Sequence, residues 1–210
     1  MIKKKILRLR EMDFFDLINH FSATCAHLKT QLFYKFFFGS VGRRTWIKSP
    51  DQIYGASRLY FGNGVRVEKG GIFYAVKRYS DKEYTGTIKI GDDTFINKNF
   101  NATSAFSIEI GSEVAFGTNV FLCDFDHGFQ DPTESRIKSA LVSKGTIRIG
   151  NKSWIGSNAF ISSGVELGEY CVVGANSVVT KSFPAFSVIA GNPARLIKTY
   201  DTSKNMWVKP

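Results

Sequence analysis

Residues 149–181 read IGNKSWIGSNAFISSGVELGEYCVVGANSVVTK and repeat one pattern every six residues. Each repeat opens with an aliphatic residue and carries a mostly small residue at its fifth position. The aliphatic residues are Ile149, Ile155, Ile161, Leu167, Val173 and Val179, and the fifth positions hold Ser153, Ala159, Val165, Cys171 and Ser177. A six-residue period with one inward aliphatic side chain is typical of a parallel β-helix, whereas an amphipathic α-helix needs steps of three and four. The pattern therefore predicts a mainly β fold of stacked coils.

The same period extends toward the N-terminus in a less regular form. It places apolar residues at Ile90, Ile96, Ala102 and Ile108 and, after a slip of two residues, at Ile110, Phe116 and Leu122, with weaker repeats near Ile53 and Leu59. The repeat then stops until Ile147, and an interruption of this length is an excursion of the kind that often carries function. We expect a β-helix domain over residues 51–198, with an excursion loop at 123–146 and a short C-terminal tail at 199–210.

Residues 1–50 follow a different period and form a basic N-terminal segment. Apolar residues recur in steps of four and three, which predicts an amphipathic α-helix over residues 12–38. They are Phe14, Ile18, Phe21, Cys25, Leu28, Leu32 and Phe36, and the face is widened by Phe15, Leu17, Phe33, Phe37 and Phe38. The segment holds ten Lys or Arg and three acidic residues, a net charge of +7. We favour packing of this helix on its own domain or a neighbouring subunit, and the alternative is association with an anionic membrane surface.

The composition argues against several other classes of protein. The chain has a formal net charge of +10, but residues 51–210 contribute only +3, so a nucleic-acid-binding body is not expected. The three cysteines, Cys25, Cys123 and Cys171, form no motif, which indicates a reducing cytoplasm without disulfides. Charged residues interrupt any apolar run that could serve as a secretion signal or a transmembrane helix. We expect a cytoplasmic protein, either free or peripheral on the inner face of the membrane.

Residues 149–198 resemble the hexapeptide-repeat acyltransferases, and in particular the branch of galactoside, maltose and polysaccharide O-acetyltransferases. The resemblance rests on the six repeats together with VVTK and AGNPAR, in that order. It implies left-handed coils, a homotrimer, acetyl-coenzyme A as acyl donor and a sugar hydroxyl as acceptor. The stretch FGSVGRRTWIKSPDQIYG, residues 38–55, resembles the start of the repeat in enzymes that decorate bacterial surface polysaccharides. It favours a polysaccharide biosynthetic role.

His127 is the candidate general base. Acetyl transfer to an alcohol needs a group that takes the hydroxyl proton, and histidine suits this task at neutral pH. His127 is the one histidine of the repeat region, it lies in the excursion loop, and the resemblance implies the catalytic role for it. A carboxylate that orients the imidazole is expected among Asp124, Asp126 and Glu134. By the same resemblance, Asn99 contacts the acceptor or the reacting centre.

The resemblance also assigns residues to the coenzyme. Positions along the pantetheine groove are Trp154, Gly156, Ser157, Gly174 and Ala175, and positions near the nucleotide are Thr180, Lys181, Arg195 and Lys198. No metal is expected, because a zinc enzyme on this fold needs three histidine ligands and the repeat region has one. No cysteine has the sequence context of a nucleophile, so we expect direct transfer. The alternatives are an acetyltransferase of a small molecule such as an antibiotic, and a binding or structural β-helix without catalysis.

Overall fold

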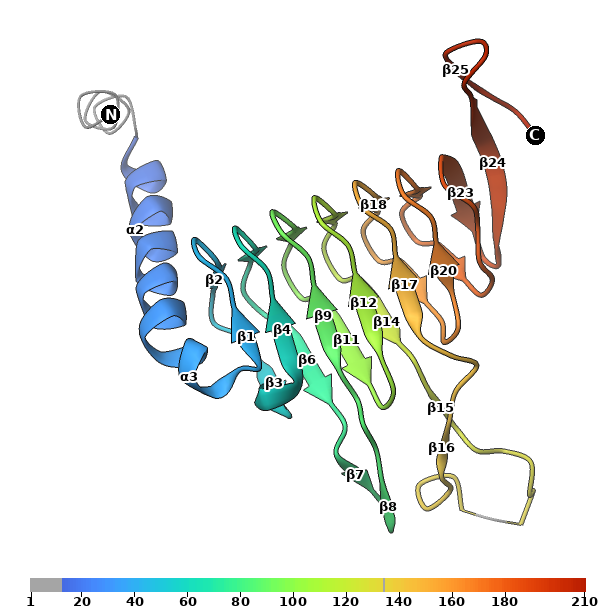
Figure 1. Ribbon diagram of the computed structural model, residues 1–210, viewed down its shortest axis with the longest axis horizontal. Helices are drawn as coiled ribbons and strands as arrows, with labels where there is room; N and C mark the ends of the chain where they lie inside the picture. Colours follow the sequence, from blue (N-terminus) through green and yellow to red (C-terminus); the bar gives the residue numbers. More distant parts are fainter. Residues whose placement is uncertain (1–12, 134) are drawn as a thin grey trace.

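A computed structural model describes residues 13–133 and 135–210, and it shows a β-helix with one α-helix across its end (Figure 1). Three sheets form the three faces of a left-handed solenoid, and each coil adds one short strand to each sheet. Sheet A contains β1 (Ser40–Val41), β4 (Leu59–Phe61), β9 (Ile88–Ile90), β12 (Ile108–Ile110), β17 (Ile147–Ile149) and β20 (Glu166–Leu167). Sheet B contains β2 (Trp46–Ile47), β5 (Arg66–Val67), β10 (Phe95–Ile96), β13 (Ala115–Phe116), β18 (Trp154–Ile155), β21 (Val172–Val173) and β23 (Ser187–Gly191). Sheet C contains β3 (Gln52–Tyr54), β6 (Ile72–Ala75), β11 (Asn101–Ser104), β14 (Phe121–Cys123), β19 (Phe160–Ile161) and β22 (Val178–Val179).

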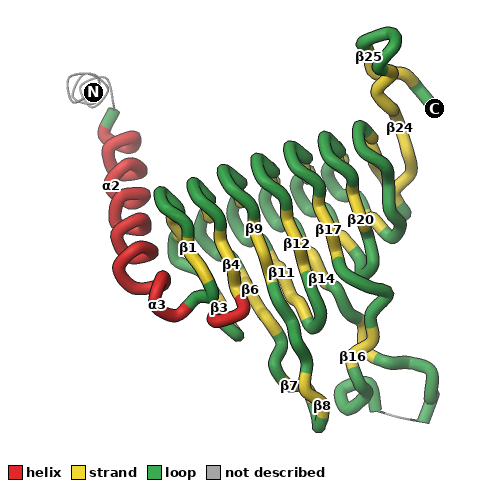
Figure 2. The backbone as a smooth tube through the Cα atoms, viewed as in Figure 1, coloured by secondary structure: helices red, strands yellow, loops and turns green. Residues whose placement is uncertain are grey.

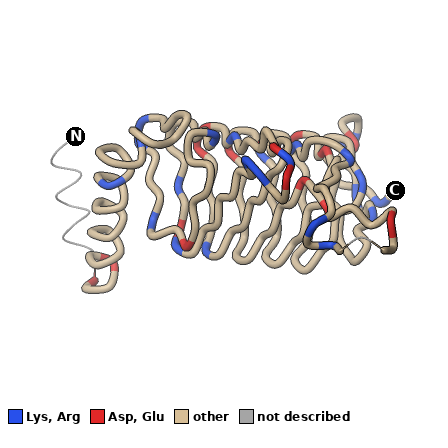
Figure 3. The backbone as a smooth tube through the Cα atoms, turned by 90° about the horizontal axis from the view of Figure 1, so that it is seen from below, with Lys and Arg blue, Asp and Glu red and all other residues tan. Residues whose placement is uncertain are grey.

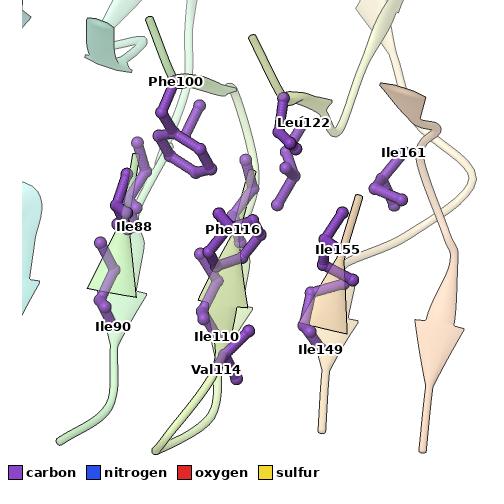
Figure 4. Packing of buried hydrophobic residues seen from close by; sticks show 14 of the residues in the cluster. Ile88, Ile90, Phe100, Ile110, Val114, Phe116, Leu122, Ile149, Ile155 and Ile161 are labelled. Atoms are coloured by element: carbon purple, nitrogen blue, oxygen red, sulfur yellow. The ribbon is translucent and has the colours of Figure 1, made fainter. Parts of the chain in front are cut away.

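The predicted aliphatic positions form the core. All six residues that open the repeats of 149–181 are buried, and the small residues at the fifth positions are buried as well. Figure 4 shows three of the six, Ile149, Ile155 and Ile161, in the core. The slip of two residues is accommodated in sheet A, where both Ile108 and Ile110 of the strand β12 face inward. They pair in register with Ile88 and Ile90 of the preceding coil. The core is therefore a set of stacked rows, each made of side chains from the same position in successive coils.

The fourth position of the repeat is a corner with left-handed backbone. Asn99, Asn119, Asn158 and Asn176 occupy this position with φ between 57° and 59°. Asparagine tolerates this conformation better than most residues. The four side chains form a ladder of amide hydrogen bonds between successive coils, from Asn99 to Asn119 (3.0 Å), Asn119 to Asn158 (2.9 Å) and Asn158 to Asn176 (3.0 Å). The ladder thus connects four coils along one edge of the solenoid.

Two excursions leave the solenoid at the same corner, between sheet C and sheet A. The predicted loop contains the antiparallel strands β15 (Asp126–His127) and β16 (Leu141–Val142) before the chain returns at β17. A second excursion, which the sequence did not reveal, is the hairpin of β7 (Arg78–Tyr79) and β8 (Lys82–Glu83). Both project from the same side of the solenoid (Figure 2). The Tyr84 hydroxyl accepts a hydrogen bond from the Leu141 amide at 2.8 Å, and the two residues share a small hydrophobic cluster.

The solenoid begins earlier than the sequence predicted, and strands extend it where the sequence predicted a tail. The first coil starts at β1, ten residues or so before the expected boundary at residue 51, because β1 and β2 already pair in parallel with β4 and β5. The expected tail is an antiparallel extension of sheet B, formed by β24 (Ala194–Asp201) and β25 (Met206–Val208). The peptide bond between Asn192 and Pro193 is cis.

The predicted N-terminal helix is present. It consists of α2 (Phe14–Lys29), a π-helical turn η1 (Thr30–Tyr34) and a last turn α3 (Lys35–Phe37). Asp13 caps its start, because the carboxylate accepts a hydrogen bond from the Asp16 amide at 2.8 Å. Among the described residues, no helix is long and apolar enough to cross a membrane.

Candidate active site

His127 lies in a cavity of about 290 Å³ between the two excursions and sheet C. The strand β15 brings it there, since His127 pairs with Leu141 across the antiparallel ladder. Sheet C contributes polar side chains from two of its strands, Gln52 of β3 and both Asn101 and Thr103 of β11. A ligand in this cavity would contact the imidazole on one side and amide or hydroxyl groups on the other. The geometry thus surrounds the candidate base with hydrogen-bonding groups.

Aromatic rings form much of the remaining wall. Tyr74 of β6 lines the cavity and stacks on Tyr54 of the preceding coil, with ring centroids 4.7 Å apart. Burial raises the pKa of the Tyr74 hydroxyl, and the neighbouring Tyr54 adds to this effect, so the phenol stays protonated. The cavity therefore combines apolar ring surface with a small number of polar groups, as ligand sites usually do.

Tyr79 from the unexpected hairpin contacts the imidazole directly. The two rings meet edge to face, with centroids 5.2 Å apart. The Tyr79 hydroxyl donates a 2.6 Å hydrogen bond to the carbonyl of Ile137, which belongs to the loop that carries His127. Tyr79 thus contacts the His127 loop at two points. Nothing in the local sequence pattern indicated this contact, because it depends on two excursions that are separated by two whole coils.

Asp124, one of the carboxylates expected to orient His127, is hydrogen-bonded to the neighbouring coil. Asp124 is buried and accepts hydrogen bonds from the Ser104 hydroxyl (2.6 Å) and the amides of Ala105 (2.8 Å) and Phe106 (3.1 Å). Burial raises its pKa, although these donors oppose the shift. Asp124 therefore fastens the start of the excursion to the neighbouring coil. Asp126 directly precedes His127 in a strand, so its side chain projects from the opposite face. Glu134 lies outside the described residues.

Asn101, rather than Asn99, lines the cavity of His127. Asn99 belongs to the corner ladder, where its amide donates to Asn119. Asn101 lies on the outer face of β11, and its Oδ1 accepts a 2.8 Å hydrogen bond from the Thr103 hydroxyl. The repeat itself contained the signal that separates them, because Ala102 occupies an inward position. The residue before an inward residue faces outward on a strand, whereas the fourth position of a repeat is a corner.

Cys123 and Cys171 are not suited to a nucleophilic role. Burial raises the pKa of the Cys123 thiol to about 11, and its sulfur donates to the Phe125 carbonyl. Cys171 lies in the core, where burial also raises its pKa. Both are neutral thiols at pH 7, and the thiolate is the reactive form.

The residues expected to bind the coenzyme lie on coils that follow the excursion of His127. Trp154 is on the outer face of β18 in sheet B and is 58% exposed. Gly156 and Gly174 follow strands of sheet B at the corner toward sheet C. At both positions the close packing of the next coil leaves no room for a side chain. A Cβ at Gly156 would lie 2.6 Å from the Ala175 amide nitrogen, and one at Gly174 would lie 2.9 Å from the Ala190 Cβ. Ser157 likewise contacts the preceding coil, since its hydroxyl accepts a 3.2 Å hydrogen bond from the Thr118 amide.

The cationic residues expected near the nucleotide are exposed at the far end of the solenoid. Lys181 lies 5.5 Å from the centroid of the Phe183 ring, and Thr180 precedes it at an exposed corner. The Arg195 guanidinium bonds the carbonyl of Ala194 at 3.1 Å, and Lys198 pairs with Val188 across β23 and β24. The cavity of His127 includes none of the expected coenzyme residues. Within one chain, the candidate base and the candidate coenzyme groove are separate.

Among the described residues, no group of three or more His, Cys, Asp or Glu side chains is arranged to hold a metal ion. His127 is the one histidine that the structure places on the solenoid or its excursions, since His20 and His27 lie in α2.

Comparison with known proteins gives one family. The model of the bacterial transferase hexapeptide (six repeats) matches residues 146–181. Galactoside O-acetyltransferase of Escherichia coli is 30% identical over 183 residues, which cover 86% of this chain and 74% of that protein. A putative lipopolysaccharide biosynthesis O-acetyl transferase of E. coli is 35% identical over 130 residues, covering 59% of this chain and 66% of its own length. The chain spans only 40% of the length of a probable acetyltransferase of Mycobacterium tuberculosis.

Solved structures agree with this result. A hexapeptide-repeat acetyltransferase of Vibrio cholerae, solved in complex with acetyl-coenzyme A, has a TM-score of 0.56 and 25% identity and covers 86% of each chain. A maltose O-acetyltransferase of Clostridium difficile has a TM-score of 0.55 and 26% identity, covering 82% of this chain and 75% of the other. The repeats, the fold and the length of the match to galactoside O-acetyltransferase show that this chain belongs to the hexapeptide-repeat acetyltransferase family.

Proposed function

We propose that this protein is an O-acetyltransferase that moves an acetyl group from acetyl-coenzyme A to a sugar hydroxyl, in the biosynthesis of a bacterial surface polysaccharide. The observation that carries the proposal is the cavity in which His127 faces Asn101, Thr103 and Gln52. A sugar presents hydroxyl groups together with apolar C–H surface, and this cavity offers amides beside the ring of Tyr74. The related lipopolysaccharide and galactoside enzymes support a carbohydrate acceptor.

The reaction is a direct transfer in a ternary complex. His127 takes the proton of the acceptor hydroxyl while that oxygen attacks the thioester carbonyl, and the tetrahedral intermediate then collapses as the C–S bond breaks. The imidazolium returns the proton to the departing thiolate. Asn101 offers its Nδ2 amide to the reacting oxygens, because its Oδ1 is already occupied by Thr103. The neutral thiols of Cys123 and Cys171 favour this route over an acyl-enzyme.

The proposal includes a homotrimer in which the site is completed between subunits. The candidate base lies in the excursion strand β15 and shares its cavity with residues of sheet C, whereas Trp154 lies on sheet B of a later coil. These are different faces of one prism, so a second copy is the simplest source of a coenzyme groove that faces His127. The free cysteines among the described residues support a reducing compartment, and we place the reaction in the cytoplasm.

Replacement of His127 by alanine should lower kcat by about 10²- to 10⁴-fold, because the acceptor hydroxyl loses its general base. Affinity for acetyl-coenzyme A should change little, since the coenzyme is held elsewhere. The measurement is acetyl transfer from labelled acetyl-coenzyme A to a panel of saccharides and, as a comparison, antibiotics. Arg195→Ala is the matched variant, and it should mainly raise the KM for the coenzyme. Near-normal turnover by an assembled His127→Ala protein would exclude His127 as the base.

Asn101→Ala and Asn99→Ala should have opposite phenotypes, although the two residues are neighbours in the sequence. Asn101→Ala should lower kcat by about 10²-fold, as loss of an oxyanion donor does, with little effect on unfolding. Asn99→Ala should lower the free energy of unfolding by about 1 kcal/mol, because alanine tolerates the left-handed corner poorly, and turnover should remain near normal. Steady-state kinetics and denaturant unfolding of both variants check this. The assignment fails if Asn99→Ala is the variant with the larger loss of kcat.

Tyr79 should act as a positioning residue for His127. Tyr79→Ala should lower kcat by about tenfold or more, because the imidazole loses its edge contact and small displacements of a reacting group are costly. Tyr79→Phe keeps the ring and should recover most of the activity. The KM for acetyl-coenzyme A should be unchanged in both, while the pH profile of kcat/KM should shift in Tyr79→Ala alone. Equal activity of both variants and the native protein would show that Tyr79 does not position the base.

Sedimentation analysis should show an active trimer. The chain has a mass of 23.5 kDa, and the trimer should persist at the concentrations used for the assay. A fully active species that sediments as the single chain would contradict the proposal of a site between subunits.

A further inference from the structure

The apolar side of the N-terminal helix faces solvent. Ten large apolar side chains between residues 14 and 37 are exposed, with values up to 72% in α2 and 79% in α3. They are Phe14, Phe15, Leu17, Ile18, Phe21, Leu28, Leu32, Phe33, Phe36 and Phe37. The apolar face therefore does not pack on the domain of its own chain, while its packing on a neighbouring subunit, the other part of the favoured expectation, stays a prediction. Soluble monomers rarely expose a continuous apolar surface of this kind without a partner.

The opposite side of the helix attaches it to the first coil. Thr30 is fully buried, and its hydroxyl accepts a 2.9 Å hydrogen bond from the Ile47 amide. The His27 Nδ1 lies 3.2 Å from the Thr45 carbonyl oxygen, and the Gln31 side-chain amide donates to the carbonyls of Gly42 (3.0 Å) and Thr45 (3.1 Å). The helix is thus held by small and polar residues, together with the rings at its C-terminal end. Because these bonds fix its rotation, the apolar side has to point away from the solenoid.

The shape and chemistry of this outward face suit a lipid surface. Phe15, Phe33 and Phe37 lie beside the row of Phe14, Ile18 and Leu32, so the face is wider than the a/d seam through which one helix packs on another. Figure 3 shows few charged residues along α2. Basic residues flank the helix in the sequence: five Lys or Arg and one acid precede Asp13, and Arg43, Arg44 and Lys48 follow it. A broad aromatic face with basic residues at both ends is the composition of an interfacial helix.

We propose that the outward face of α2, η1 and α3 docks on the surface of an anionic bilayer, with the apolar side chains among the acyl chains and the neighbouring Lys and Arg among the headgroups. Apolar burial supplies the main part of the binding free energy, and each basic residue close to an anionic surface adds to it. Since α2 lies across the N-terminal end of the solenoid (Figure 1), docking places the first coil next to the lipid. That coil includes Gln52, which lines the cavity of His127.

The test measures binding of the full chain to vesicles of phosphatidylcholine with and without phosphatidylglycerol. At low ionic strength the native protein should bind the anionic vesicles, and salt should weaken the binding because it screens the basic residues. Phe21→Glu combined with Leu32→Glu should lower the affinity at least tenfold, since two exposed apolar contacts are lost. The matched control is Asn19→Glu combined with His20→Glu, which adds the same charge at exposed polar positions of α2 and should bind more tightly than the first variant.

Two further measurements distinguish loss of membrane binding from loss of the proposed enzyme activity and from loss of contacts between copies of this chain. Acetyl transfer to a free saccharide should be the same in both double variants, which shows that the solenoid and its site are intact. Sedimentation should show the same oligomer for all three proteins. Failure of the native protein to bind anionic vesicles would overturn the proposal. A smaller oligomer for Phe21→Glu with Leu32→Glu would also overturn it, because the face would then be a contact between copies of this chain.

Discussion

The structure depends on one constraint, which is that each coil must stack in register on the one before it. Every strand is only two to five residues long within the parallel part of the solenoid, so no strand is stable without its neighbours above and below. The register places identical positions of the repeat over one another, as in the row that pairs Phe95 with Ala115 and Ala115 with Trp154. Close stacking also limits which residues fit at the corners between sheets. The space between coils at Gly156 admits only glycine without a shift, because a Cβ there would lie 2.6 Å from the Ala175 amide nitrogen, and Asn158 adopts a left-handed backbone at the next corner.

The same constraint explains how a site arises on a solenoid. Loops that leave a rigid scaffold often carry functional residues, and the cavity of His127 lies where two such excursions meet sheet C. Both interruptions leave from the corner between sheet C and sheet A, and register therefore brings them together although two complete coils lie between them in the sequence. Asp124 fastens one of them to the Ser104 corner, and Tyr84 connects the two through the Leu141 amide. The result is a cavity whose walls are rigid sheet on one side and paired loops on the other, with the candidate base at their junction.

The N-terminal helix contacts its domain through its polar side, which is the reverse of the usual arrangement for an amphipathic helix. The usual inference places the apolar side of a helix against the core of its domain. Here the end of the solenoid offers exposed carbonyls and amides of the first coil, such as the Thr45 carbonyl and the Ile47 amide. Polar groups at the end of a sheet need hydrogen-bonding partners, and Thr30 and Gln31 provide them. The helix therefore caps the solenoid with its polar side, and its apolar side is free for another surface.

The sequence alone was sufficient to predict the coils, because the six-residue period with inward Ile155, Ile161 and Leu167 is a local property that recurs in every repeat. It was also sufficient to predict the long excursion from the solenoid and the position of His127 within that excursion. It did not separate Asn99 from Asn101, although the phase of Ala102 contained that information. Only the tertiary structure decided the contact between Tyr79 and His127, the burial of Asp124 and the direction of the apolar side of α2. Those features depend on which segments come into contact once the coils are stacked. A contact between segments that are distant in the chain produces no periodic pattern in the sequence of either segment.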